Sequence, residues 1–163
     1  MSAKLIFMHL CTMEQLNFKP ISLPIKNNEN KKHIWDPFRK KWVLLSPEEW
    51  VRQHCLAFLV DEKVFPKTLI NVEKQLIVDG VKKRYDIIVF SPQGKVLLLV
   101  ECKAPNVIIS QRTFDQIAQY NRAVQSHLLM VTNGINHYFC DMKQSNDHYH
   151  FIENLPSYKQ LMG

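Results

Sequence analysis

The sequence is poor in the small and bridging residues on which several kinds of site depend. It contains only four glycines, and none of them forms the Gly-x-x-x-x-Gly-Lys-[Ser/Thr] loop that cradles nucleotide phosphates. Its four cysteines include no Cys-x-x-Cys pair, and their spacing matches no zinc pattern. These absences exclude a P-loop and a cysteine-rich zinc site within this chain. Three of the cysteines lie in apolar stretches, which favours a reduced, cytoplasmic setting.

Long hydrophobic runs are also missing. The apolar segment 1–13 is broken by His9 and lacks a small-residue cleavage site, so we expect neither a membrane span nor a signal peptide. Met13 is an alternative start of the chain. The apolar fraction of 46% and the length of 163 residues are typical of one soluble globular domain. The net charge of +6 is compatible with a nucleic-acid partner but does not require one.

Composition divides the chain into an arm and a domain. Residues 1–32 contain two prolines and the polar run 26–32, which predicts a mobile N-terminal arm. Residues 33–163 are expected to form the folded domain. Within it, the segment 46–49 (Ser-Pro-Glu-Glu) predicts a helix start, with Ser46 as N-cap and Glu49 completing a capping box. The helix is expected to end near residue 60 or 61.

The order of the remaining elements indicates the fold class. We expect a strand over 68–76, two strands within 84–105, a helix over about 111–126, strands over 127–132 and 135–140 around an Asn-Gly turn, and a short C-terminal helix. This order predicts an α/β fold, with a mixed central sheet flanked by helices. The strand before the second helix and the strand after it are predicted to be parallel neighbours.

The segment 84–105 carries charge where a buried strand should have none. Asp86, Glu101 and Lys103 interrupt otherwise apolar strands, and such charges are costly unless they are paired or hold a metal. If residues 93–94 form a two-residue turn, paired positions sum to 187 and Asp86 lies opposite Glu101, on one face. A divalent cation would then relieve the repulsion between the two carboxylates.

Two alternatives to this shared site stay open. A type I turn with a glycine bulge at residues 91–94 shifts the register by one and turns Asp86 to the other face, unless a bulge near the charged end restores it. Alternatively, Asp86 and Glu101 are strand-end residues that form salt bridges with Arg84 and Lys103.

Several of these residues resemble known motifs. Asp86, followed after fourteen intervening residues by Glu101-Cys102-Lys103, resembles the D…(D/E)-x-K motif of the PD-(D/E)XK nuclease superfamily, with Tyr85 in place of the usual proline. Gln116 and Tyr120 are similar to the Q-x-x-x-Y motif of the branch with RecB-like nucleases and type I restriction enzymes. Over roughly residues 33–140 the chain resembles the N-terminal nuclease domain of type I restriction enzyme R subunits.

The resemblance implies a restriction-endonuclease-like αβββαβ core and a Mg²⁺- or Mn²⁺-dependent DNA endonuclease. It implies that Asp86, Glu101 and the backbone carbonyl of Cys102 hold the metal. Lys103 would orient the attacking water or stabilise the developing charge. Gln116 and Tyr120 would act beside it from one side of the second helix. A polar helix flank explains those two residues without any role in the site.

The remaining expectations concern neighbouring residues and partners. Glu49 is a further candidate metal ligand, although the capping box explains it equally well. Lys82, Lys83 and Arg84 are candidate nucleic-acid contacts, although charge runs are usually only solvated. The resemblance implies DNA, helicase or translocase subunits, methyltransferase subunits and a second copy of the chain as candidate partners. The alternative function is a non-catalytic module of the same fold that binds nucleic acid or protein.

Overall fold

The computed structural model describes residues 13–78, 80–143 and 149–163. Its strands are β1 (Ile25–Asn28), β2 (Lys31–Asp36), β3 (Lys41–Leu44), β4 (Ile70–Val78), β5 (Val81–Phe90), β6 (Val96–Cys102), β7 (Leu128–Thr132), β8 (His137–Asp141) and β9 (His150–Ile152). Its α-helices are α1 (Pro47–Ala57), α2 (Gln111–Val124) and α3 (Tyr158–Met162). A π-helical turn, Phe58–Glu62, extends α1, and a 3-10 turn, Lys67–Leu69, precedes β4.

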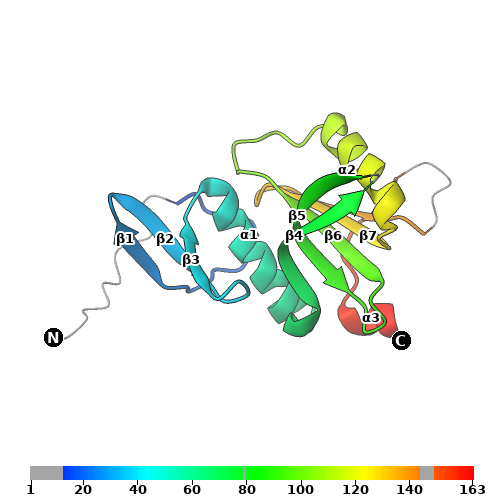
Figure 1. Cartoon of the computed structure of the whole chain (residues 1–163), viewed down its shortest axis with the longest axis horizontal. Coiled ribbons are helices and arrows are strands. Elements are labelled where there is room, and N and C mark those ends of the chain that lie inside the picture. The colour runs from blue at the N-terminus through cyan, green and yellow to red at the C-terminus, as the bar shows by residue number, and fades with distance from the viewer. Residues whose placement is uncertain (1–12, 79, 144–148) are drawn as a thin grey trace.

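The strands form a mixed six-stranded sheet and a smaller three-stranded one (Figure 1). The larger sheet has the order β4-β5-β6-β7-β8-β9, and the smaller has β1-β2-β3. Every neighbouring pair is antiparallel except β6 and β7, which α2 connects. The predicted mixed α/β class and the parallel pair are therefore confirmed, and the described elements run α1-β4-β5-β6-α2-β7 through the middle of the chain.

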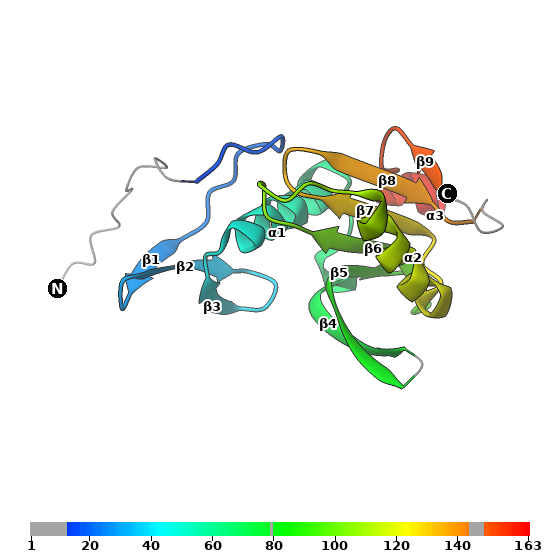
Figure 2. The same cartoon turned by 90° about the horizontal axis from the view of Figure 1, so that it is seen from above.

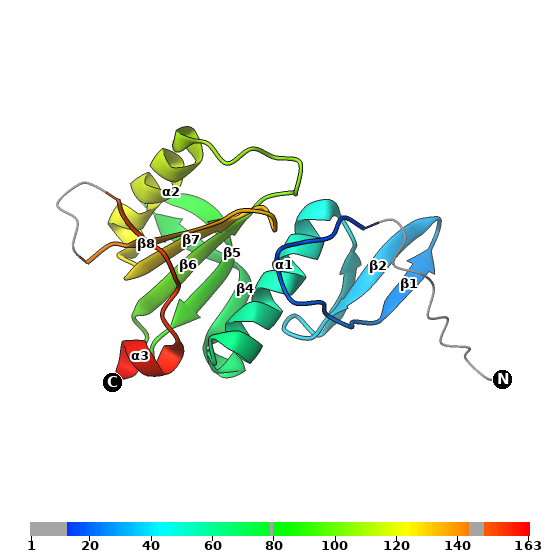
Figure 3. The same ribbon diagram turned by 180° about the vertical axis from the view of Figure 1, so that it is seen from behind.

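Helices α1 and α2 cover opposite faces of the large sheet, as the apolar clusters show. One cluster joins α1 to the inward side chains Ile87, Val89, Leu98 and Val100. The other joins α2 to Ile88, Leu99, Leu129 and Val131. Alternate residues of β5 and β6 thus enter different clusters, as the period of two in a strand requires. Helix α1 also separates the large sheet from the small one (Figures 1 and 3).

Only one of the two hydrogen bonds of the capping box predicted for α1 is present in the structure. The Ser46 hydroxyl accepts a hydrogen bond from the Glu49 N–H at 3.0 Å, and Pro47 occupies the first turn. The second half of the capping box is wrong: the Ser46 N–H donates to the Leu44 carbonyl, and the Glu49 carboxylate turns to Arg39, Arg52 and Gln53. Buried cations thus take the carboxylate that the cap would have used.

The described part of the expected N-terminal arm, residues 13–32, makes contacts with the domain. Residues 1–12 lie outside the described residues, but from Met13 onward the segment packs on the domain. Leu16 is buried in the α1-side core, and the Asn17 N–H donates to the Gly134 carbonyl at 2.7 Å. The Trp50 indole N–H donates to the Glu14 carbonyl at 3.2 Å. Apolar contacts and strand pairing of β1 outweigh the polar, proline-containing composition here.

The absence of a side chain at Gly134 allows Leu16 to pack against the β7–β8 turn. Its φ is +84°, and a Cβ at this position would lie 2.7 Å from Leu16 Cδ2 and 3.0 Å from Val51 Cγ2. Gly134→Ala is therefore expected to destabilise the protein by about 2–3 kcal/mol through backbone strain and overpacking. Gly94→Ala is the matched control, because its φ is +79° and nothing lies within 4 Å of the added Cβ. Urea denaturation should show a larger loss at 134 than at 94, and equal losses would contradict the contact with Leu16.

Candidate functional site

The register of the β5–β6 hairpin, continued one residue beyond its last pair, matches Asp86 with Glu101. Ile87 pairs with Val100, and Val89 pairs with Leu98, so the positions sum to the predicted 187. The turn itself is wider than two residues, since the Ser91 N–H donates to the Lys95 carbonyl. A bulge between Val89 and Phe90 compensates for this turn. The compensation is at the turn end of the hairpin, whereas the sequence suggested the charged end.

The Asp86 carboxylate lies between both strands and α1. Its Oδ2 accepts from the Cys102 N–H at 2.7 Å, which ties β5 to the end of β6. Its Oδ1 accepts from the Arg52 guanidinium at 2.6 Å. Asp86 is therefore held from two sides, and the sequence-based alternative in which Arg84 is its partner is not what the structure forms: Arg84 lies 3.9 Å from Glu73 instead.

Glu101 and Lys103 form the other half of this cluster. The Lys103 ammonium donates to Glu101 Oε1 at 2.7 Å, and both side chains are partly buried. Burial raises the pKa of Glu101, the charge of Asp86 raises it further, and Lys103 opposes the shift. The pKa of Lys103 is also raised, because Glu101 and Asp86 outweigh the effect of burial. Asp86, Glu101 and Lys103 thus act on one another at the end of the hairpin.

The carboxylate that α1 contributes to this cluster is Glu48 rather than Glu49. Burial and the charge of Asp86 raise the pKa of Glu48, while Arg52 and Lys103 lower it. The charge of Glu48 in turn acts on Glu101. Glu49, the residue predicted as a candidate ligand, contacts Arg39, Arg52 and Gln53. Neighbouring helix residues point about 100° apart, so the choice between them depends on how α1 is rotated over the sheet.

Gln116 and Tyr120 lie together on α2, next to Lys83. The Lys83 ammonium donates to the Tyr120 hydroxyl at 2.8 Å and lies 4.3 Å from the ring centre. The Gln116 side-chain amide donates to the same hydroxyl at 3.4 Å. The hydrogen bond from Lys83 lowers the pKa of Tyr120, as does that from Gln116, and the charge of Glu101 raises it. Lys83 therefore ties the predicted pair to β5, whereas Glu101 acts on Tyr120 through its charge alone.

Tyr85, which stands where the family motif has proline, has a buried hydroxyl without a hydrogen-bond partner in the described residues. Burial raises the pKa of Tyr85, and the charges of Tyr120 and Glu101 raise it further. Tyr85 and Tyr120 both pack in the α2-side core. An orphaned buried hydroxyl beside carboxylates is a group that a bound species could satisfy.

Next to these residues lies an ionic cluster, formed by Asp36, Arg39, Glu49, Arg52 and Glu73, that the sequence did not suggest. Arg39 contacts three carboxylates, those of Asp36, Glu49 and Glu73. Arg52 contacts Glu49 and lies 3.8 Å from Glu73. Through its bond to Asp86, Arg52 connects the ionic cluster to the end of the hairpin.

Asp36 anchors the ionic cluster from the small sheet. It is 0% exposed and accepts from the backbone N–H groups of Phe38 and Arg39 at 2.7 and 2.9 Å. Its other oxygen accepts from Gln53 Nε2 at 3.0 Å. Asp36 thus joins β2 to α1, and it fixes the Arg39 side chain over the first turn of the helix.

The residues could hold a metal by their donor chemistry. Carboxylate oxygens are the ligands that Mg²⁺ and Mn²⁺ prefer, and Asp86, Glu101 and Glu48 supply them around a position where like charges already oppose one another. Within the described ranges, no three His, Cys, Asp or Glu side chains are grouped closely enough to form a ready metal site. Arg52 and Lys103 are the cations beside these carboxylates.

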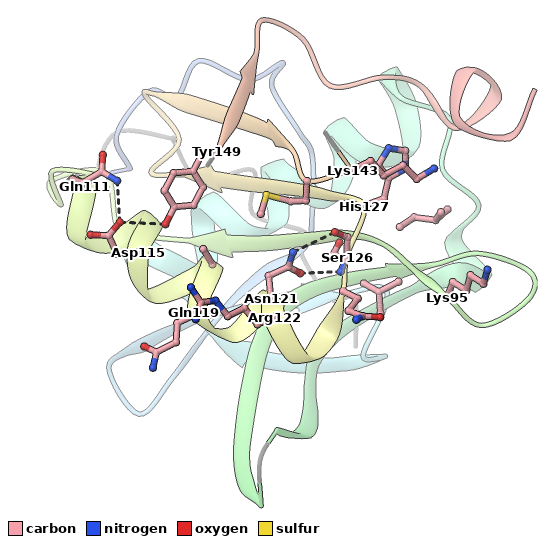
Figure 4. Close-up of a pocket in the computed structure, with 15 residues that line it drawn as sticks. Lys95, Gln111, Asp115, Gln119, Asn121, Arg122, Ser126, His127, Lys143 and Tyr149 are labelled. Atoms are coloured by element: carbon pink, nitrogen blue, oxygen red, sulfur yellow. Dashed lines mark hydrogen bonds between the residues drawn. The ribbon is translucent and has the colours of Figure 1, made fainter. Parts of the chain in front are cut away.

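A cavity of about 1060 Å³ lies elsewhere, along α2 and the end of β8 (Figure 4). Its lining includes Lys95 and Val96, at the opposite end of β6 from Glu101, together with Arg122, His127 and Tyr149. None of the predicted site residues lines it. The candidate site at the end of the hairpin is therefore separate from this cavity, and it is identified by the chemistry of its side chains.

Comparisons with known proteins found one family model and similar solved structures. A model described as the type I restriction enzyme R protein N terminus (HSDR_N) matches residues 47–156. Among solved structures, a fragment assigned to the HsdR subunit of a type I restriction enzyme from Vibrio vulnificus YJ016 aligns with a TM-score of 0.54 and 17% identity. The alignment covers 72% of this chain but only 25% of that one. A search of curated proteins finds no match. No described helix is long and apolar enough to span a bilayer.

Proposed function

This chain belongs to the family of type I restriction enzyme R protein N-terminal domains, and from that premise we propose that it is a metal-dependent DNA endonuclease of restriction-endonuclease-like fold. The observation that carries the proposal is geometric: Asp86 accepts from the Cys102 N–H at the end of the β5–β6 hairpin, and the residues on either side of Cys102, Glu101 and Lys103, form an ion pair there. Such a combination of paired acids and a lysine costs stability and suits phosphodiester chemistry.

Asp86 and Glu101 would hold Mg²⁺ or Mn²⁺, with Glu48 and the carbonyl of Cys102 as further ligands. The metal, when bound, polarises the scissile phosphate and lowers the pKa of a bound water. Lys103 already lies within hydrogen-bond reach of Glu101, so its ammonium is placed to stabilise negative charge that develops on the phosphate. Asp86 fixes the distance between the strands through its bond to the Cys102 N–H.

Gln116, Tyr120 and Tyr85 have supporting roles in this proposal. The Tyr120 hydroxyl accepts from Gln116 and Lys83, so its own proton is free to bind a water or a phosphate oxygen. The orphaned Tyr85 hydroxyl is a second donor beside Glu101. Both would orient a ligand near the carboxylates, whereas neither is needed to bind the metal.

A cleavage assay tests the proposal. Supercoiled plasmid is incubated with Mg²⁺ or Mn²⁺ and the protein, and Asp86→Asn and Lys103→Gln are each expected to lower the cleavage rate by about 10²–10³-fold. Lys159→Gln, at an exposed position of α3, is the matched control and should cleave at the wild-type rate. Cleavage that persists in the Asp86 and Lys103 variants would show contamination and remove the site assignment.

One observation favours the alternative, a non-catalytic module that binds nucleic acid or protein. Each carboxylate already has an internal cation, since Arg52 contacts Asp86 and Lys103 contacts Glu101. In a module without catalysis these pairs would be structural. Calorimetry separates the two functions: heat of Mn²⁺ binding that disappears in Asp86→Asn supports the endonuclease, and absence of binding and of cleavage supports the module.

Partners follow from the family and are proposals for this chain. An R-subunit N-terminal domain implies DNA as substrate, with translocase and methyltransferase subunits in the same assembly and a cytoplasmic setting. Cutting both strands of a duplex with one site would also require a second copy of the chain or a second binding event.

A further inference from the structure

The outer half of the β4–β5 hairpin projects beyond the sheet (Figure 2). Strand β5 pairs with β4 from Val81 to Val89, but it pairs with β6 only from Ile87 to Phe90. The residues of β5 before Asp86 therefore have a strand on one side only. A two-stranded ribbon that continues past its sheet is marginal by itself, so a functional reason for its length is worth seeking.

One face of this ribbon is exposed, basic and apolar. Residues opposite each other in the ladder share a face, which groups Gln75 with Arg84 and Ile77 with Lys82. All four are exposed; Ile77 is 72% and Arg84 64% exposed. The same face leads inward to Glu73, 3.9 Å from Arg84, and to Asp86 two residues further along β5. The cations thus extend outward from the proposed catalytic centre.

The opposite face fixes the ribbon to the body. Leu76 packs on the α2-side core, and the Lys83 ammonium, directly across from it, contacts Tyr120 on α2. Lys83 is therefore engaged within the protein, while Lys82 and Arg84 are exposed, with Arg84 lying 3.9 Å from Glu73 at the base of the ribbon. This contact holds the ribbon in one direction relative to the carboxylates.

We propose that this outer hairpin is an arm that lies in a groove of duplex DNA and guides one strand to Asp86 and Glu101; the inference rests on the proposed endonuclease function. The major groove is wide enough for a two-stranded β-ribbon. Strand residues two apart are separated by about 6.6 Å, close to two base steps of about 3.4 Å, so Arg84 and Lys82 can reach phosphates two base steps apart. Ile77, beside Lys82, offers an apolar contact to base edges such as the thymine methyl.

Binding of a labelled 30-base-pair duplex, measured by fluorescence anisotropy in EDTA, tests the arm without cleavage. Lys82→Gln/Arg84→Gln is expected to weaken binding about tenfold and to reduce the slope of log affinity against log salt by about 1.8, because two phosphate contacts are lost. Ile77→Ser should weaken binding severalfold and leave the slope unchanged, since no charge is removed. Circular dichroism checks that each variant folds.

The matched control is Lys67→Gln/Lys159→Gln, which removes the same charge from exposed positions outside the hairpin. Equal losses in both double variants, or wild-type binding by the hairpin variants, would overturn the arm even if the protein cleaves DNA. Hairpin-dependent binding by a protein that never cleaves would keep the arm and remove the endonuclease. Failure of the wild type to bind the duplex, or binding of single strands alone, also overturns the proposal.

Discussion

Replacing Arg39 by methionine is expected to destabilise the protein by about 3–5 kcal/mol, because it removes the shared cation of three carboxylates. Asp36 and Glu49 are buried, and Glu73 is partly buried. Burial alone lowers the pKa of Arg39, but the hydrogen bond to Asp36 and the charges of Glu49, Asp36 and Glu73 raise it overall. The guanidinium therefore stays charged, and its loss leaves acids that burial has removed from water.

Thermal and urea denaturation measure this effect. The midpoint temperature should fall by about 6–20 °C for a domain of this size. Lys41→Met is the matched control: Lys41 is exposed on β3, opposite Asp36 in the ladder, and its loss should change stability by less than about 0.5 kcal/mol. A loss for Arg39→Met no larger than that of the control would mean that the three carboxylates are solvated or paired elsewhere.

The order of elements could be predicted because its signals are local. A serine and a proline start α1, the Asn-Gly turn joins β7 to β8, and apolar periodicity identifies α2. The register of the β5–β6 hairpin could not be decided in the same way. It depends on a wide turn at residues 91–95 and on a bulge at Val89–Phe90 that cancels it, and packing on both faces selects that combination.

The ionic cluster could not be predicted because its members come from separate elements. Asp36 ends β2, Arg52 lies on α1, Glu73 lies on β4, and no spacing in the sequence relates them. The same limit explains why the sequence predicts Glu49 rather than Glu48 as a candidate ligand. The capping rule identifies where the helix starts, but only the packing of α1 on the sheet decides which of the two carboxylates is turned toward Asp86. The composition of residues 13–24 assigns them to the arm, but the side chain of Leu16 is buried in the α1-side core.

Arg52→Gln is expected to destabilise the metal-free protein by about 3–5 kcal/mol, for a reason that differs from Arg39. The Arg52 guanidinium contacts Glu48, Glu49 and Asp86, and only 6% of the side chain is exposed. Burial lowers the pKa of Arg52, but the charges of Asp86 and Glu49 raise it well above its usual value. Without the guanidinium, Asp86 and Glu48 would face Glu101 with Lys103 as their nearby cation.

If Asp86 and Glu101 bind a metal as proposed, that metal should restore the positive charge, and with it the stability, that Arg52→Gln removes. Adding Mn²⁺ supplies positive charge beside Asp86, so the midpoint temperature should rise more in Arg52→Gln than in the wild type. The same addition should give Arg39→Met no more than the wild-type rise, because the acids that lose this cation, Asp36, Glu49 and Glu73, are not among the proposed metal ligands of the hairpin end. Equal shifts in all three proteins would contradict a metal beside Asp86. A larger shift in Arg52→Gln alone would show that the arginine and the metal compete for one carboxylate. The arginine would then be the internal counter-ion that keeps the acids together before the metal binds.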